Sequence, residues 1–423
     1  MLFKFLKSRR YKNLDPDEIL LDASNLPSFD KQQFEGQLER PIGKTSLYAA
    51  GVGFLVIIIF LAGRIGYLEL FRGEAFAARG ESNSLRHTPI FAERGIIYDR
   101  NGEELAWNAP ERTYLDKPGL AHVLGFVGYP NEIDASKKDF DHKEVIGREG
   151  VERAYNDILD GDKGIKIEET DVTGKVISDH LLEEPKSGES LTLSIDAKLQ
   201  SKLYELIRDL AIDKDFKAGA GVVMDIKTGE LLALTSYPEY NPNLVTVGKD
   251  PEAIRRYLSD PQSPFLNRAI SGIYTPGSIF KIIMAAGALN EKIISPTKTI
   301  VSTGKLTIPN PYDPKNPSIF KDWKAHGAVD MRRALAVSSN VYFYVMGGGF
   351  AGQEGLGISR IDKYAKLFGL GASTGIVLGK EAVGVIPTPE WKKKNFNGED
   401  WRLGDTYHSS IGQYGFLVTP IQM

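Results

Sequence analysis

Residues Tyr274–Asn290 read YTPGSIFKIIMAAGALN, a proline, a glycine and a serine followed by a mainly apolar run. Pro276 and Gly277 stand directly before Ser278, and the apolar residues behind it predict a buried helix that begins at the serine. Residues three apart in a helix share a face, so Lys281 is placed one turn beyond Ser278. A serine nucleophile needs a base within reach, and this pair needs no histidine. The stretch predicts Ser278 as an acyl-accepting nucleophile and Lys281 as its base.

The pattern S-x-x-K is too frequent in this chain to identify a nucleophile by itself. It begins at five serines, which are Ser28, Ser278, Ser295, Ser302 and Ser318. Ser295 is followed by proline and Ser302 by a nearby glycine, and both are poor helix starts. Ser28 precedes the predicted membrane segment, and no apolar helix follows Ser318. Context therefore selects Ser278.

A second motif, S-x-N, occurs once, at Ser338-Ser339-Asn340 in the apolar sequence ALAVSSNVYFYVMG. Polar residues at such a position can simply cap or interrupt a helix, and for the motif alone that alternative stays open. Because the motif accompanies Ser278 and Lys281, we interpret Ser338 and Asn340 as further members of a catalytic site.

The motifs lie in a domain that we predict over residues 191–423, with its core from about 218. Residues 191–196 alternate as a strand, and Asp196 is the predicted N-cap of a leucine-rich helix. Gly219–Ser236 reads as two apolar strands joined by a Lys-Thr-Gly turn at 227–229. This order of elements predicts a mixed α and β domain of the α+β class.

Upstream, residues 67–190 are polar and turn-rich, and we predict a β-rich pedestal there. Within it, Arg94–Asn108 (RGIIYDRNGEELAWN) reads as two short strands around an Asn101-Gly102 turn. The pedestal would stand between the membrane segment and the domain that carries the motifs.

The run Thr45–Gly63 holds 19 residues without a charge. As a helix it spans roughly 28 Å, about one hydrocarbon core. A long segment precedes it and no cleavage site follows, which favours an uncleaved anchor over a signal peptide or a buried core helix. We predict a cytoplasmic tail over 1–44 and a single transmembrane helix over 45–66, with the remaining chain outside because the tail is basic.

Composition excludes several function classes. The 423 residues carry a net charge of −3 with both signs mixed, which gives no basic face for nucleic acid. The chain has no cysteine, and its six histidines show no HExxH-type pairing. We therefore expect neither a metal nor a cofactor.

The sequences YTPGSIFK, SSN, LNRAISG and IGQ...VTPIQ resemble the transpeptidase domain of class B penicillin-binding proteins. RGIIYDRNGEELAWN and GREGVERAYNDILDG resemble the pedestal, or dimerisation-type domain, of the same family. DW...HG at Asp322 to Gly327 is most similar to the penicillin-binding protein 2 group, which acts in cell elongation. The resemblance implies a penicillin-binding/β-lactamase-like serine transpeptidase fold.

By this resemblance, the activity would be D,D-transpeptidation between D-Ala-D-Ala stem peptides of peptidoglycan. Ser278 would attack the penultimate D-Ala carbonyl, and Lys281 would take the hydroxyl proton. Ser338 would relay a proton to the leaving amine, and Asn340 would hold the donor peptide. β-Lactams would stall the acyl-enzyme. The implied partner is a SEDS-family glycosyltransferase of RodA type, and the implied location is the bacterial inner (cytoplasmic) membrane.

The third motif of this fold, K-T-G or K-S-G, is missing downstream of Ser278. The Lys-Thr-Gly at 227–229 precedes the nucleophile and is interpreted as a hairpin turn. In the family the motif follows IGQ...TP, close to where this chain stops, so we expect a C-terminally truncated chain that could be inactive. A division-specific transpeptidase, a D,D-carboxypeptidase and a non-catalytic membrane scaffold or β-lactam sensor remain as alternatives.

Weaker candidates are left out of the site. His326 is interpreted as a hydrogen-bonded structural residue, and Asp405 as ordinary loop or cap chemistry. Lys392–Lys394 is interpreted as a solvated face, and the aromatic residues 342–344 as core.

Overall fold

The computed structural model describes residues 44–131, 134, 143–170, 175–310 and 313–423. The chain divides into two units, Met1–Ser84 and Leu85–Met423. The predicted cytoplasmic tail, residues 1–44, lies outside the described residues except for Lys44.

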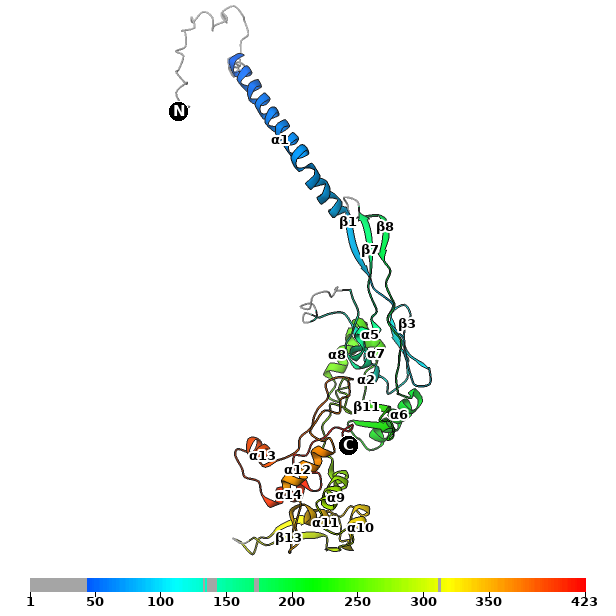
Figure 1. The fold of residues 1–423 in the computed structure, drawn as a ribbon, viewed down its shortest axis with the longest axis vertical. Helices are drawn as coiled ribbons and strands as arrows, with labels where there is room; N and C mark the ends of the chain where they lie inside the picture. Colours follow the sequence, from blue (N-terminus) through cyan, green and yellow to red (C-terminus); the bar gives the residue numbers. More distant parts are fainter. Residues whose placement is uncertain (1–43, 132–133, 135–142, 171–174, 311–312) are drawn as a thin grey trace, which may run out of the picture. The chain divides into compact units, whose positions relative to one another are not determined.

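The described part of the first unit is one long helix, α1, Lys44–Ser84 (Figure 1). Its segment Leu47–Glu74 is long and apolar enough to cross a membrane, and no other helix in the described ranges meets both conditions. Large apolar side chains on it are exposed, such as Phe54 at 68% and Phe60 at 72%. Water would oppose such a surface, whereas a bilayer would cover it. The helix predicted over 45–66 is present, and it continues to Ser84.

The second unit begins with an antiparallel sheet in the order β1-β7-β8, whose strands run side by side in Figure 1. Its strands are β1 Leu85–Ile90, β7 Gly164–Thr170 and β8 Val176–Glu183. The register pairs Leu85 with Glu169 and Ile90 with Gly164, so strands far apart in the sequence close this sheet.

A four-stranded sheet has the order β4-β3-β2-β9. Its strands are β2 Ile97–Tyr98, β3 Glu104–Asn108, β4 Arg112–Tyr114 and β9 Leu191–Thr192. Strands β2 and β3 form the hairpin predicted around Asn101 and Gly102. Asp99 stabilises the turn, because its Oδ1 accepts from the backbone N–H groups of Asn101 at 2.7 Å and Glu103 at 2.9 Å. This local prediction is confirmed.

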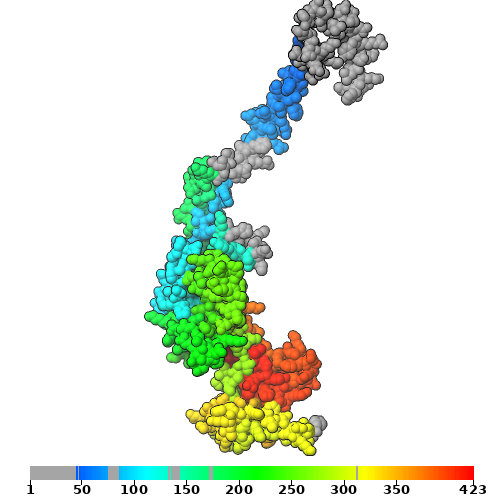
Figure 2. All heavy atoms as spheres, turned by 180° about the vertical axis from the view of Figure 1, so that it is seen from behind, coloured from blue at the N-terminus to red at the C-terminus, as the bar shows by residue number. Residues whose placement is uncertain are grey.

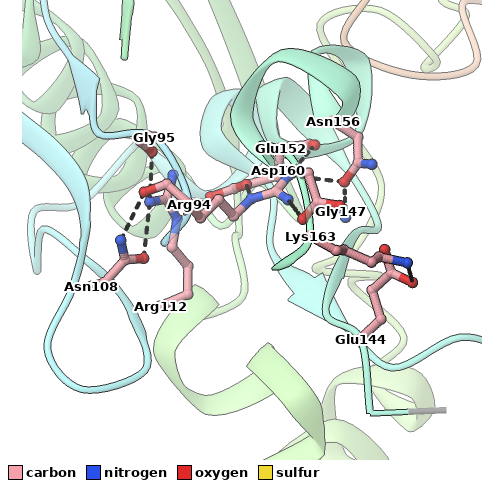
Figure 3. Close-up of polar contacts among 10 residues, drawn as sticks. All are labelled: Arg94, Gly95, Asn108, Arg112, Glu144, Gly147, Glu152, Asn156, Asp160 and Lys163. Carbon is pink, nitrogen blue, oxygen red and sulfur yellow. Dashed lines mark hydrogen bonds and ion pairs between the residues drawn. The ribbon is translucent and has the colours of Figure 1, made fainter. Parts of the chain in front are cut away.

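Short elements of the pedestal surround a cluster of charged side chains (Figure 3). The elements are α2 Ala121–Leu124, α4 Gly150–Ala154, α5 Asn156–Leu159, β5 Val127–Gly128 and β6 Ile146–Gly147. Glu152 is completely buried and accepts from Arg94 Nε and Arg112 Nε, both at 2.6 Å. Arg94 also donates to Asp160 at 3.1 Å and Asn156 at 3.0 Å. The cluster ties the segment before β2 to strand β4 and to helices α4 and α5.

The helix and hairpin predicted after residue 191 are both present. Helix α6 spans Ala197–Asp213, and its N-cap Asp196 accepts from the backbone N–H groups of Lys198 and Leu199, both at 3.0 Å. Strands β10 Gly219–Met224 and β11 Leu231–Tyr237 pair antiparallel. Residues 227–229 lie in the turn between these strands, as predicted.

The remaining chain is mainly helical, with two short strand pairs. The helices are α7 Pro242–Val245, α8 Pro251–Ser259, α9 Lys281–Asn290, α10 Met331–Ala336, α11 Asn340–Gly348, α12 Gly357–Leu367, α13 Pro389–Asn395 and α14 Leu403–Ser409, with 3-10 turns η3 Thr246–Gly248 and η4 Gly277–Phe280. The strand pairs are β12 Ile300–Ser302 with β15 Gly327–Val329, and β13 Lys305–Ile308 with β14 Ser318–Lys321. Helices α9, α11, α12 and α14 lie together in Figure 1, and their side chains contribute to a large hydrophobic core. Tyr342 and Phe343 are completely buried in it, as predicted.

A second hydrophobic core runs across the predicted boundary at residue 190. It contains Leu105 and Ala106 of β3 together with Leu234 of β11 and Ile270. Strand β9 also pairs in parallel with β2. The mixed α and β class is confirmed, whereas the division into a pedestal over 67–190 and a transpeptidase domain over 191–423 stays a prediction.

Candidate active site

Ser278 lies in the 3-10 turn η4, directly before α9. Gly277 has a φ of +59°, in the left-handed region that glycine adopts without strain, so the chain can turn sharply before the serine. Ser278 is exposed, whereas Phe280 is completely buried in the large core. The apolar side of this turn fixes the backbone while the serine remains accessible.

Lys281, the first residue of α9, is only 1% exposed. Its Nζ donates to Ser338 O at 2.9 Å, to Ser338 Oγ at 3.1 Å and to Asn340 Oδ1 at 2.7 Å. The structure thus brings three of the four predicted site residues into direct contact. The fourth, Ser278, stands one turn earlier on the same helical segment. The catalytic roles of these four residues stay predictions.

Burial lowers the pKa of Lys281 to about 8, although the negative charge of Asp322 acts in the opposite direction. The ring of Phe343, with its centroid 5.5 Å from Nζ, lies beside the amine. An amine with this pKa is partly neutral near neutral pH, and a neutral amine can accept a proton from a serine hydroxyl. This pKa is compatible with the predicted role of Lys281 as the base, and that role stays a prediction.

The S-x-N motif forms the turn between α10 and α11. Ser338 has a φ of +53°, which residues other than glycine rarely adopt. Ser339 is the N-cap of α11, and its Oγ accepts from Tyr342 N at 3.4 Å. Capping, the alternative considered for this motif, is correct for Ser339. Ser338 and Asn340 instead contact Lys281.

A loop after α14 holds the turn that carries Ser278 in place. Gly277 N donates to Gly412 O at 3.0 Å, and Tyr274 exchanges two backbone hydrogen bonds with Val418, at 2.8 and 2.9 Å. Figure 2 shows the red segment lying against the yellow-green one. The sequence did not predict this long-range support, because Ile411-Gly412-Gln413 carries no local signal of its partner.

A buried carboxylate outside the predicted set also contacts the motif. Asp322 follows β14, and its Oδ2 accepts from Ser339 Oγ at 2.9 Å and from Val341 N at 3.0 Å. In the sequence, Asp322 stood out only as part of DW...HG, a likeness that assigned it no role.

None of the other sequence candidates is among the hydrogen-bond partners of Lys281 Nζ within the described residues. Lys392, predicted on a solvated face, has a side chain only 3% exposed and donates to Asp405 Oδ2 at 2.7 Å. The interpretation is wrong for Lys392, because the fold places Asp405 of α14 beside it, and it is correct for Lys393 and Lys394, which are exposed. His326 Nε2 lies 3.6 Å from Asp322 Oδ1. Across the described ranges, no group of three or more His, Asp or Glu residues is arranged to hold a metal ion.

Two family models match the chain, the penicillin binding protein transpeptidase domain over residues 219–423 and the penicillin-binding protein dimerisation domain over residues 108–193. The peptidoglycan D,D-transpeptidase MrdA of Acinetobacter baumannii is 30% identical, over 92% of this chain and 67% of its own length. The chain belongs to the penicillin-binding protein family. The family predicted from the motifs is thereby confirmed.

This penicillin-binding protein is also similar to solved structures of the predicted group. Pseudomonas aeruginosa PBP2 in complex with WCK 5153 matches with a TM-score of 0.66 and 30% identity, over 80% of this chain and 68% of that one. Helicobacter pylori PBP2 in complex with MreC matches with a TM-score of 0.68 and 26% identity, over 80% and 76%. The chain spans 46% to 70% of the length of the MrdA relatives from three species.

Proposed function

We propose that this penicillin-binding protein is a serine D,D-transpeptidase that cross-links peptidoglycan stem peptides during cell elongation. The observation that carries the proposal is the contact of the buried Lys281 amine with both Ser338 and Asn340, one turn beyond Ser278. The names of the relatives support the same reaction.

The reaction proceeds in two steps. Ser278 Oγ attacks the carbonyl carbon of the penultimate D-Ala, and its proton passes to the neutral amine of Lys281. An ester forms as the amide bond breaks, and the terminal D-Ala amine leaves with a proton relayed through Ser338. Asn340 binds the donor peptide. An acceptor amine then attacks the ester and a new amide forms as the ester bond breaks. The proton that this amine loses passes through Lys281 to the departing Ser278 Oγ.

Labelling of the full chain with a fluorescent penicillin tests the nucleophile. We expect the wild-type protein in membranes to form a covalent adduct and Ser278→Ala to form none, because the ester needs the hydroxyl. Both proteins are produced from the whole reading frame, so that any K-T-G or K-S-G motif encoded after Met423 is included. Ser318→Ala alters another S-x-x-K serine, at the start of β14, and should be labelled like wild type. A wild-type chain without label, or a label that persists in Ser278→Ala, would contradict the proposal.

We infer that α1 anchors the chain in the bacterial inner membrane, with the N-terminus in the cytoplasm and the catalytic unit outside. The apolar surface of α1 and the basic residues before it support this orientation. The polymerising partner that we propose is a SEDS-family glycosyltransferase of RodA type, which contacts residues 45–190. Co-purification that survived deletion of these residues would exclude that contact.

The elongation role is separable from a division role by depletion of the protein in its host. Loss of an elongation transpeptidase is expected to give round cells, because side-wall synthesis stops while division continues. Filaments would instead indicate a division-specific enzyme. The likeness to MrdA and PBP2 proteins supports the first outcome.

A further inference from the structure

Asp322 is a buried carboxylate at the centre of the hydrogen bonds around the S-x-N turn. Its side chain is 0% exposed. Oδ2 accepts from Ser302 Oγ at 3.2 Å, Ser339 Oγ at 2.9 Å and Val341 N at 3.0 Å. Oδ1 accepts from the backbone N–H of Trp323 at 2.9 Å. One side chain therefore joins the end of β12, the segment after β14 and the start of α11.

The turn that Asp322 holds is strained. Ser338 has a φ of +53°, and a non-glycine residue keeps such a conformation only where its surroundings enforce it. Asp322 binds the residues that follow Ser338, whereas Trp323 Nε1 donates to Val337 O, the carbonyl before it, at 3.2 Å. The pair Asp322-Trp323 thus restrains both sides of the residue whose hydroxyl and carbonyl contact Lys281.

The charge of Asp322 also reaches the amine. Burial alone would raise the pKa of Asp322, but the N–H groups of Val341 and Asn340 and the Ser339 hydroxyl hold it below the usual value. The side chain is therefore an anion at neutral pH. Its charge favours the protonated form of Lys281 and opposes the effect of burial. Two further ionisable groups face the carboxylate. His326 Nε2 lies 3.6 Å from Asp322 Oδ1, and burial together with the charge of Asp322 raises the pKa of Tyr344 to about 12.

We propose that Asp322 is a positioning residue for acylation, which holds the Ser338–Asn340 turn against Lys281 without touching the substrate. The proposal rests on the proposed transpeptidase function. Ser338 and Asn340 can receive and orient the lysine amine only while this turn keeps its geometry. The carboxylate fixes that geometry through Ser339, the residue of the motif that does not contact Lys281.

The test is the pH profile of acylation by a fluorescent penicillin, measured on the full chain in detergent. In Asp322→Asn, the plateau rate at high pH should fall about tenfold or more, because a small displacement of catalytic groups is costly. The inflection should move to lower pH, because Lys281 loses the neighbouring negative charge. A merely structural residue would lower the amount of folded protein without moving the inflection.

Two further variants separate the effect of the hydrogen bonds on the turn from the effect of the Asp322 charge on Lys281. Ser339→Ala removes one hydrogen bond to Asp322 and the side-chain cap of α11 but keeps the charge of Asp322, so the plateau should fall while the inflection stays. This variant also serves if Asp322→Asn does not fold. Asp330→Asn is the matched control, since Asp330 caps α10 by accepting from Arg333 N at 2.8 Å and does not bind the turn. It should keep the wild-type plateau and inflection.

Hydrogen exchange at residues 338–341 gives a readout that needs no acylation. The amide of Val341, which donates to Asp322, should exchange faster in Asp322→Asn than in Asp330→Asn. If the wild-type chain takes no label, the proposed function fails, and the exchange rates alone decide the role of Asp322. If the wild-type chain is labelled, wild-type acylation rates in both Asp322→Asn and Ser339→Ala would overturn the positioning role. If the wild-type chain is not labelled, an unchanged exchange rate of the Val341 amide in Asp322→Asn would overturn it.

Discussion

In the proposed mechanism, Lys281 is both a hydrogen-bond donor and a proton acceptor. Its ammonium form has three N–H groups, and the three oxygen contacts from Ser338 and Asn340 use all of them. The neutral amine has two N–H groups and a lone pair. Among the three oxygens, only the hydroxyl Ser338 Oγ can turn its own proton toward that lone pair. Ser338 is therefore suited to carry a proton between Lys281 and the leaving amine.

The acylation rate is expected to follow the ionisation of Lys281. Its pKa of about 8 means that the rate should rise about tenfold per pH unit below that value and level off above it, because only the neutral amine takes the proton. The rate of labelling by a fluorescent penicillin, from about pH 6 to about pH 10, measures this. Lys281→Arg stays charged throughout and should remain unlabelled. A rate independent of pH would remove Lys281 from the role of base.

At the residue scale, the sequence identified candidate residues where a chemical motif stands beside a local structural signal. Ser278 was selected because a Pro-Gly pair and an apolar helix surround it, and the S-x-N motif because it occurs once. Asp322 was missed because its contact with Ser339 joins residues 17 positions apart through tertiary folding. Lys392 was misread for the same reason, since its partner Asp405 lies on another helix.

At the scale of elements, the turn before α9 depends on a segment that follows it much later in the chain. The predicted elements with strong local signals are present, such as α6 with its N-cap Asp196 and the β10–β11 hairpin. The short 3-10 turn η4 has few internal hydrogen bonds of its own. Its position comes from the backbone bond between Gly277 and Gly412, a long-range pairing that no periodic pattern indicates.

Gly412→Ala is expected to weaken this support. Gly412 has a φ of +68°, and an added Cβ would collide with the carbonyl oxygen of Gly277. We expect the free energy of unfolding to fall by about 1 to 3 kcal/mol and acylation to fall about tenfold or more, since Ser278 would be displaced.

The matched control is Gly398→Ala, at a φ of +84° with no heavy atom within 4 Å of the added Cβ. It should lose only about 1 kcal/mol from backbone strain and keep its acylation rate. Thermal melting and penicillin labelling of both variants provide the comparison. Equal loss of acylation in Gly412→Ala and Gly398→Ala would show that the loop does not position the nucleophile.

At the scale of the whole molecule, the unit Leu85–Met423 has two main hydrophobic cores, which support different parts of the structure. One surrounds α9 and α11 and supports the candidate active site. The other joins β3 of the pedestal to α6 and β11. The sequence predicted the pedestal and the domain that carries the motifs. It did not predict that one hydrophobic core and one sheet would contain residues from both sides of the boundary at residue 190. The apolar residues of a strand do not indicate which other element packs on them. Changes in the pedestal should therefore affect stability more than chemistry.

Variants in the charged cluster of the pedestal test whether this region affects stability without affecting acylation. Glu152→Gln would leave Arg112 buried without its counter-charge and Arg94 with Asp160 as its remaining partner, so we expect the free energy of unfolding to fall by about 3 to 5 kcal/mol. Asp179→Asn removes an exposed partner of Lys166 and should cost at most about 1 kcal/mol. Urea titration of the full chain measures both changes, and penicillin labelling per folded molecule should equal wild type in each. A small stability loss in Glu152→Gln, or slower labelling of its folded fraction, would mean that the pedestal cluster and the active site act as one structure.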